Sequence, residues 1–248
     1  MKIFLIVLAI ILVVLVLILG LSGVLFRFGA KVSDSQMAKA NGQELLREKR
    51  RVLAVAAHPD DLEYWPSGTL GELIKNGSDV TIVICTKNQT EGDIRKEEQL
   101  RAADILGYTK VIFLDLPDRY LPGHANELRQ KLSDVFKEIK PDTVFTFDAE
   151  KEGPVYHHRD HEEAGKITEE VSKTQNIKHI YFFHTSAPDT LVDISDIINK
   201  KLEALDAHVS QSHILFGFNF RDTQLRRMLR SYGKIIGVEY AEPFRKGW

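Results

Sequence analysis

The chain has 248 residues, of which 44% are hydrophobic and 27% are charged, and its formal net charge is −2. This length is sufficient for one large domain with a substantial core. The nearly balanced charge argues against a basic nucleic-acid-binding protein, and the single cysteine, Cys85, excludes a disulfide framework within the chain.

The N-terminal segment from Ile3 to Phe26 carries no charged residue and is almost wholly aliphatic. At about 1.5 Å per residue, a helix of this length crosses a hydrocarbon core of roughly 30 Å. Residues 1–26 therefore predict a single-pass transmembrane helix. The alternative, a cleaved signal peptide, typically has an apolar region of only about 7–15 residues. Basic residues flank the segment on both sides, and the positive-inside rule favours a cytoplasmic C-terminal domain by a small margin.

After this segment a polar connector is expected over 27–50, and from Arg51 onward strands and helices alternate. Apolar runs typical of buried strands alternate with segments of helical periodicity. The predicted strands are 52–57, 80–85, 110–114, 143–147 and 179–183, and the predicted helices are 68–76, 94–106, 125–139, 161–172 and 194–207. This order predicts an α/β, Rossmann-like domain over 51–248, with a mostly parallel sheet and helices on both faces. A short late strand is expected over 235–240.

A first polar motif, Ala57-His58-Pro59-Asp60-Asp61, directly follows the first predicted strand. Pro59 lacks a backbone donor and so ends a central strand. In open α/β sheets, ligands bind at this carboxyl end of the strands. A histidine and two carboxylates are costly to crowd together unless a cation balances the charge. The alternative interpretation is a polar turn whose aspartates cap the next helix.

A second motif, Tyr156-His157-His158-Arg159-Asp160-His161, follows the predicted strand 143–147 and a loop. Asp160 is expected to be the N-cap of the next helix, with Glu163 at the capping-box position. In a parallel sheet this loop emerges at the same edge as His58. The alternative interpretation is a surface loop that happens to be rich in histidine.

Together the two motifs supply two imidazoles and one carboxylate, from His58, Asp61 and His161. A catalytic zinc site typically uses three protein ligands of this kind and leaves a position for water. Calcium or magnesium, which prefer oxygen ligands, would not favour two imidazoles. The spacing therefore predicts a zinc site.

Three ionisable residues of the motifs remain beside these ligands. Asp60 is a candidate general base for an attacking water. His158 is a candidate electrophile that stabilises an oxyanion, with Asp160 holding His158 in its donor tautomer. The pattern as a whole predicts metal-assisted hydrolysis.

The motifs, in this order, resemble those of the zinc de-N-acetylases of the PIG-L or LmbE-like family. Other segments that resemble the family are Arg95 with Glu98, Ala102 to Gly107, Leu114 to Asp118, Lys140 to Thr146, Lys201 with Ala204, His208, Ser210 and Gln211, and Ala241 to Phe244. The resemblance covers roughly 51–245. It implies zinc ligands at His58, Asp61 and His161, a base at Asp60, and an electrophilic His158 supported by Asp160.

The resemblance also implies that Arg95 contacts substrate. Alternatively, Arg95 pairs with Glu98 on a helix surface, and His208 is equally well a structural histidine in the core. Two loops depart from the family pattern. Trp65-Pro66-Ser67-Gly68 replaces a glycine-rich turn, and 86–92 replaces a Thr-Arg-Gly-Glu-x-Gly segment. Because of these differences, the resemblance does not determine the identity of the substrate.

The function expected from the sequence is a zinc-dependent hydrolase that removes acetate from an N-acetylglucosamine-type substrate, lipid-linked or membrane-associated, with no nucleic acid as partner. One alternative is a membrane-tethered sugar-binding module without turnover, which would need no base at Asp60. Another is a deacetylase of a small soluble N-acetylglucosamine conjugate. A dinucleotide-binding protein is disfavoured because no Gly-x-Gly-x-x-Gly follows the first strand.

Overall fold

The computed structural model describes residues 31–248 except 89, 154–156, 212–213 and 216–217. The transmembrane helix expected over 1–26 lies outside the described residues. Among the residues that are described, no helix is both long enough and apolar enough to cross a bilayer.

A seven-stranded sheet forms the centre of the domain, in the order β3-β2-β1-β4-β5-β9-β6. Its strands are β1 (Arg51–Ala56), β2 (Asp79–Lys87), β3 (Lys110–Pro117), β4 (Thr143–Phe147), β5 (His179–Phe183), β6 (Thr190–Asp193) and β9 (Ala241–Lys246). The five strands from β3 to β5 run parallel, as predicted. Strand β9 is antiparallel to both β5 and β6, so the sheet is mixed at this edge. Two short strands, β7 (Ile214–Leu215) and β8 (Phe218–Asn219), pair separately.

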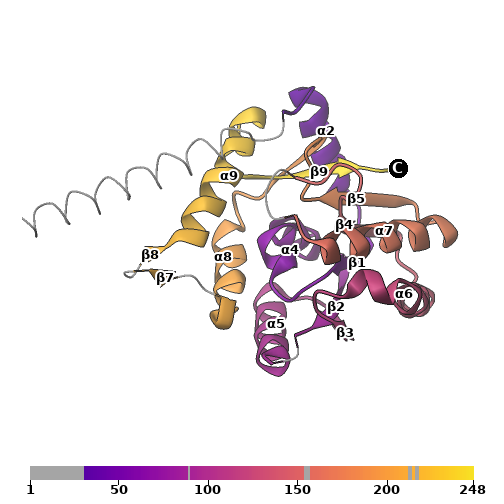
Figure 1. The fold of residues 1–248 in the computed structure, drawn as a ribbon. Helices are drawn as coiled ribbons and strands as arrows, with labels where there is room; N and C mark the ends of the chain where they lie inside the picture. The colour runs from indigo at the N-terminus through magenta and orange to yellow at the C-terminus, as the bar shows by residue number, and fades with distance from the viewer. Residues whose placement is uncertain (1–30, 89, 154–156, 212–213, 216–217) are drawn as a thin grey trace, which may run out of the picture.

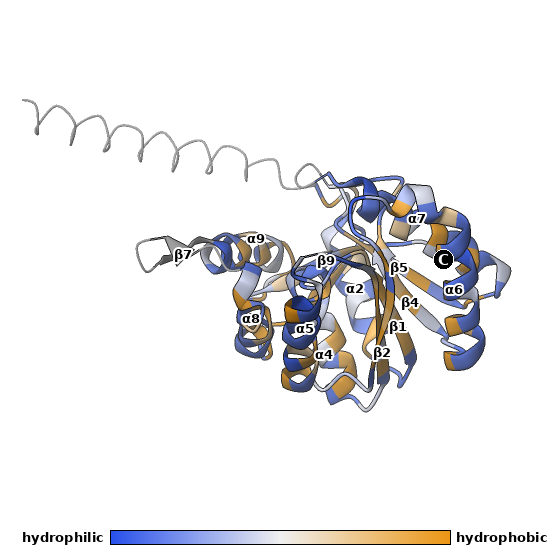
Figure 2. Ribbon diagram, turned by 60° about the horizontal axis from the view of Figure 1, so that its bottom comes forward, coloured by the Kyte–Doolittle hydropathy of each residue, from blue (hydrophilic) through white to orange (hydrophobic). Residues whose placement is uncertain are grey.

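Helices cover both faces of this sheet (Figure 1). They are α2 (Ser35–Leu45), α3 (Asp61–Tyr64), α4 (Ser67–Lys75), α5 (Gly92–Leu106), α6 (Ala125–Ile139), α7 (Arg159–Thr174), α8 (Ile198–Asp206) and α9 (Phe220–Ile236), with short 3₁₀ turns η2 (Leu121–His124) and η3 (Val209–Gln211). Figure 2 shows α6 and α7 on one side of the sheet and α4, α5 and α8 on the other. The predicted layer arrangement is therefore confirmed for the domain.

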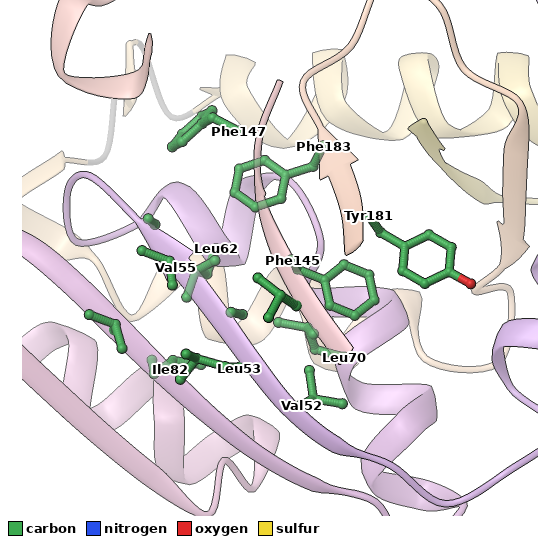
Figure 3. Close-up of a cluster of buried hydrophobic side chains, with 14 of the residues drawn as sticks. Val52, Leu53, Val55, Leu62, Leu70, Ile82, Phe145, Phe147, Tyr181 and Phe183 are labelled. Carbon is green, nitrogen blue, oxygen red and sulfur yellow. The ribbon is translucent and has the colours of Figure 1, made fainter. Parts of the chain in front are cut away.

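The core lies along the central strands because these are apolar on both faces, as parallel strands covered by two helix layers must be. Every residue from Val52 to Ala57 is fully buried. Figure 3 shows the aromatic side chains of β4 and β5, including Phe145, Tyr181 and Phe183, packed beside the aliphatic residues of β1. Cys85 is also fully buried within β2, as befits a structural cysteine.

Helix α2 occupies much of the segment that the sequence suggested was a polar connector. Ala38 and Leu45 of this helix are fully buried. A Cβ atom on Gly42 would lie 2.0 Å from the carbonyl oxygen of Leu191, so glycine allows α2 to lie directly on β6. The helix therefore packs on the domain as part of it.

The prediction of a late strand over 235–240 is wrong. Those residues include the last turn of α9, and the final strand begins at Ala241. Tyr232 and Ile236 lie four residues apart on one helical face and pack with Ala38 and Leu191. The pair Ile235-Ile236 thus belongs to a helix that is apolar on its inner side.

Candidate active site

The candidate site lies at the carboxyl end of the parallel strands. Strands β1 and β4 are neighbours, but the chain proceeds from β1 toward β2 and β3, and from β4 toward β5. The loops after β1 and β4 therefore diverge to opposite faces of the sheet, and in open α/β sheets ligands bind at such a point. The first motif follows β1, and the second follows β4 and leads into α7.

The structure brings His58, Asp61 and His161 together, as the sequence predicted. Asp61 Oδ2 accepts a hydrogen bond of 2.7 Å from the backbone N–H of His58 and lies 3.4 Å from His58 Nδ1. Asp61 Oδ1 lies 3.3 Å from His161 Nε2. Each of the three residues is 8% exposed. One carboxylate thus bridges two imidazoles that are a hundred residues apart in the chain.

Further carboxylates surround His58. Its Nε2 lies 3.2 Å from Asp118 Oδ1 and 3.4 Å from Asp160 Oδ2. Burial by itself would lower the pKa of His58, but hydrogen bonds with Asp118, Asp160 and Asp61 raise it well above its ordinary value. Such a concentration of negative charge favours a bound cation.

A divalent metal fits this donor set. The ring nitrogens of His58, His158 and His161 lie within 4.8 Å of one another, so the site offers a third imidazole beside Asp61. His161 Nε2 faces Asp61, whereas its buried Nδ1 has no hydrogen-bond partner among the described atoms. Imidazoles mixed with a carboxylate suit zinc and other transition metals better than calcium or magnesium.

Asp60 stands at the turn between β1 and α3 in a left-handed backbone conformation, with φ of 86°. A non-glycine residue in this conformation is strained, and strain of this kind clusters at functional sites. Its backbone N–H donates to Gln99 Oε1 at 3.3 Å. Burial, together with the charge of Asp61, raises the pKa of Asp60 to about 6. A carboxylate with this pKa is suited to accept a proton near neutral pH.

Arg95 pairs with the first motif and not with Glu98. Its Nη2 donates to the carbonyl oxygen of Pro59 at 2.6 Å and lies 3.4 Å from Asp60 Oδ1. Glu98 instead accepts hydrogen bonds from the backbone and hydroxyl of Ser210. The helix-surface alternative for Arg95 is thus excluded, and the guanidinium lies beside the candidate base.

The structure corrects the expected role of Asp160. Helix α7 begins at Arg159 and its N-cap is His158, so Asp160 is not the cap. The carboxylate of Asp160 accepts from the backbone N–H groups of Arg119 and Leu121, at 2.6 and 3.1 Å. These bonds direct it toward η2 and His58, because the buried carboxylate must satisfy its oxygens with the nearest donors.

His158 is nevertheless held in a donor tautomer, by a different group. The backbone N–H of Asp160 donates to His158 Nδ1 at 3.2 Å. In a neutral imidazole the other nitrogen, Nε2, must then carry the proton. Burial and the nearby His58 and His161 lower the pKa of His158, which favours this neutral form.

A buried polar network supports the first motif from behind. Gln99 Nε2 donates to Glu63 Oε1 at 2.9 Å, and His208 Nε2 lies 3.2 Å from Glu63 Oε2. Lys201 Nζ lies 2.9 Å from Glu242 Oε1, and both side chains are fully buried. His208 is therefore a structural histidine, and Lys201 and Glu242 belong to the same buried support of the first motif.

Three residues near the site were not singled out from the sequence as site residues. Asp118 follows β3, and His184 follows β5. Ligand atoms of Glu152, His161 and His184 lie within 4.8 Å of one another. The signal available for Asp118 and His184 was their position after a parallel strand, since all such strand ends meet at one edge.

Both loops that depart from the family pattern contact the surroundings of the site. Trp65 stacks on His184, with ring centroids 4.4 Å apart. Asn88 donates to Asp118 Oδ2 at 3.1 Å. These loops therefore shape the rim of the candidate site.

Comparisons with known proteins agree with this geometry. Residues 53–172 match the family model described as PIG-L, GlcNAc-PI de-N-acetylase. A diacetylchitobiose deacetylase from Thermococcus kodakarensis is 30% identical over 230 residues, covering 82% of this chain and 85% of the relative. A probable N-acetyl-alpha-D-glucosaminyl L-malate deacetylase 2 from Bacillus anthracis is 28% identical, covering 79% of this chain and 94% of the relative.

A solved structure shows the same likeness. The N,N'-diacetylchitobiose deacetylase from Pyrococcus horikoshii, complexed with its inhibitor MPG, aligns with a TM-score of 0.71 at 26% identity. The alignment covers 87% of this chain and 93% of that one. This chain belongs to the PIG-L (LmbE-like) family of de-N-acetylases. The sequence-based prediction of an N-deacetylase is confirmed at this level.

Proposed function

We propose that this protein is a metal-dependent hydrolase, most suited to zinc, that removes acetate from an N-acetylglucosamine-type substrate carried on a lipid or another membrane-associated molecule. The observation that carries the proposal is the buried cluster of His58, Asp61 and His161 with Asp60 beside it. The names of the relatives support an N-acetylated amino sugar as the substrate class.

His58, Asp61 and His161 would hold the metal, which would act as a Lewis acid toward the acetamide carbonyl. Asp60 takes the proton of the attacking water, which its raised pKa allows near neutral pH. Arg95, beside Asp60, holds the turn in place through the Pro59 carbonyl.

His158 lies beside His58 and His161 and acts on the oxygen of the reacting carbonyl. Its Nε2–H is free to donate to the developing oxyanion, because Nδ1 already accepts from the backbone of Asp160. Return of the proton from Asp60 to the amide nitrogen then lets the C–N bond break, which releases the amino sugar and acetate. A sugar-binding module would need neither a poised base nor this tautomer, so the arrangement supports an enzyme.

The membrane part of the proposal comes from the sequence. The uncharged segment from Ile3 to Phe26 is long enough to cross a bilayer as a single-pass anchor, with the catalytic domain on the cytoplasmic face. A domain tethered in this way meets a membrane-borne substrate at a high effective concentration. A small soluble substrate gains nothing from the tether.

The test is competition between two substrates in vesicles that contain the full chain loaded with zinc. A lipid-linked N-acetylglucosamine and diacetylchitobiose are offered together, and the deacetylated products are measured by mass spectrometry. We expect the lipid-linked compound to be preferred. Preference for diacetylchitobiose would favour the soluble-substrate alternative, which the Thermococcus relative supports. Absence of both products would refute the catalytic proposal.

A further inference from the structure

Helix α9 has a basic outer face that the candidate active site does not use. Its inner side is apolar, with Leu225, Leu229, Tyr232 and Ile236 buried at helical spacing. On the outer side a shallow groove, here called the α9 groove, is lined by Thr223, Arg226, Arg227, Arg230, Ser231 and Lys234. Four of these six side chains are basic and two carry a hydroxyl.

Nearby acidic residues pair with only two of the four basic side chains. Arg226 Nε lies 3.2 Å from Asp222, and Arg230 Nη2 lies 3.2 Å from Glu239. Arg227 and Lys234 are exposed and form no ion pair with a described residue. The α9 groove therefore keeps positive charge, and guanidinium groups match the oxygens of a phosphate group.

The first described residues, from Lys31 onward, lie next to this helix. Val32 packs in a small cluster with Ala38, Tyr232 and Ile236. Lys39 Nζ donates to the carbonyl oxygen of Ile236 at 2.9 Å. The N-terminal half of α2 thus lies against the C-terminal half of α9, and both helices are seen in the upper part of Figure 1.

The length of chain limits how far the apolar segment lies from the α9 groove. Phe26, the last residue of the segment, precedes Val32 by six residues. An extended chain spans at most about 3.6 Å per residue, so Phe26 lies within about 22 Å of Val32. If the apolar segment enters a membrane, the short chain between Phe26 and Val32 therefore keeps the basic face of α9 near the surface of that membrane.

We propose that the α9 groove docks on anionic phospholipid headgroups of the membrane in which residues 3–26 are anchored. Each Lys or Arg near an anionic bilayer is worth about fivefold in the binding equilibrium. Docking would fix the orientation of the domain over the bilayer. The proposal rests on the anchor in the proposed function and is independent of the catalytic chemistry.

A fluorophore on the full chain in vesicles tests the proposal. Because the only native cysteine is fully buried and burial raises its thiol pKa, Ser231→Cys is labelled selectively. Vesicles contain a nitroxide-headgroup lipid as quencher, with or without phosphatidylserine. We expect strong quenching with phosphatidylserine and loss of it at high ionic strength. A label at Glu138→Cys on α6, on the opposite side in Figures 1 and 2, should stay unquenched.

Charge reversal in the labelled chain supplies the matched comparison. Arg227→Glu with Lys234→Glu should weaken docking by at least about 25-fold. The control, Lys137→Glu with Lys178→Glu, makes the same charge change at exposed sites elsewhere and should leave quenching unchanged. Thermal melts check that both variants remain folded, and the salt titration of the unaltered groove is an independent test.

The proposal is overturned if quenching is equal on neutral and anionic vesicles or survives reversal of the α9 groove. Failure of the chain to float with vesicles would overturn both the anchor and the docking. Acetate release measured in detergent reports separately on catalysis, so the two proposals fail distinguishably.

Discussion

Replacing Lys201 by methionine tests whether the buried charges behind the first motif stabilise the domain. Lys201 Nζ pairs with Glu242 and also donates to the carbonyl oxygens of Glu63, Tyr64 and Trp65 around the end of α3. The substitution keeps most of the volume but leaves the Glu242 carboxylate buried without its cation. Breaking a buried pair in this way typically costs about 3–5 kcal/mol.

A cost of this size should be plain in a thermal melt. For a domain of this length, each kcal/mol lowers the Tm by about 2–4 °C, so Lys201→Met should melt roughly 6–20 °C below the parent chain. Lys166→Met, an exposed lysine on α7, is the control and should change the Tm little. The double variant Lys201→Met with Glu242→Gln should recover part of the loss, because the uncompensated charge is gone. A drop of less than about 2 °C for Lys201→Met would refute the reasoning, since it would mean that water solvates the pair.

Three further predictions concern the base, the metal and the N-terminal helix. Asp60→Asn should keep its metal while kcat falls by about 10²–10⁴-fold or more. Near-normal turnover would exclude Asp60 as the general base. His161→Ala should lose most of its zinc in metal analysis, whereas the exposed neighbour His157→Ala should keep it; equal zinc in both would exclude His161 as a ligand. A chain beginning at Lys31 should melt as the full chain does, whereas one beginning at Gln43 loses the buried Ala38 and should melt several degrees lower. Equal melting temperatures would mean that α2 adds no stability.

Local sequence patterns predicted much of the fold. The helix 125–139 and the strands 143–147 and 179–183 have the bounds that periodicity and flanking residues indicated. Gly107 ends α5 at φ of 87°, as expected of a glycine after a helix. The edge of the sheet was harder to predict, because β9 joins β5 and β6 only through long-range pairing that no local pattern encodes.

The candidate site was likewise predictable only in part. The residue types and their position after parallel strands were sufficient to predict that His58, Asp61 and His161 lie close together, because parallel strands of one sheet end at the same edge. The hydrogen-bond partners were not predictable in this way. The carboxylate of Asp160 accepts from the backbone of Arg119 and Leu121 and not from His158, and Asp118 approaches His58 from the end of β3, because a buried carboxylate takes the donors that packing places nearest.

The sequence by itself determined the chemistry available to this protein: an uncharged N-terminal segment, an alternating α/β order, and two motifs that bear imidazoles and carboxylates. Only the tertiary structure decided how these parts act together. It packs α2 against α9, so that the chain enters the domain beside a basic groove. It buries Lys201 with Glu242 behind the first motif and strains Asp60 into place beside Arg95. These contacts join residues far apart in the chain, and their energies depend on burial that exists only once the sheet and both helix layers have assembled.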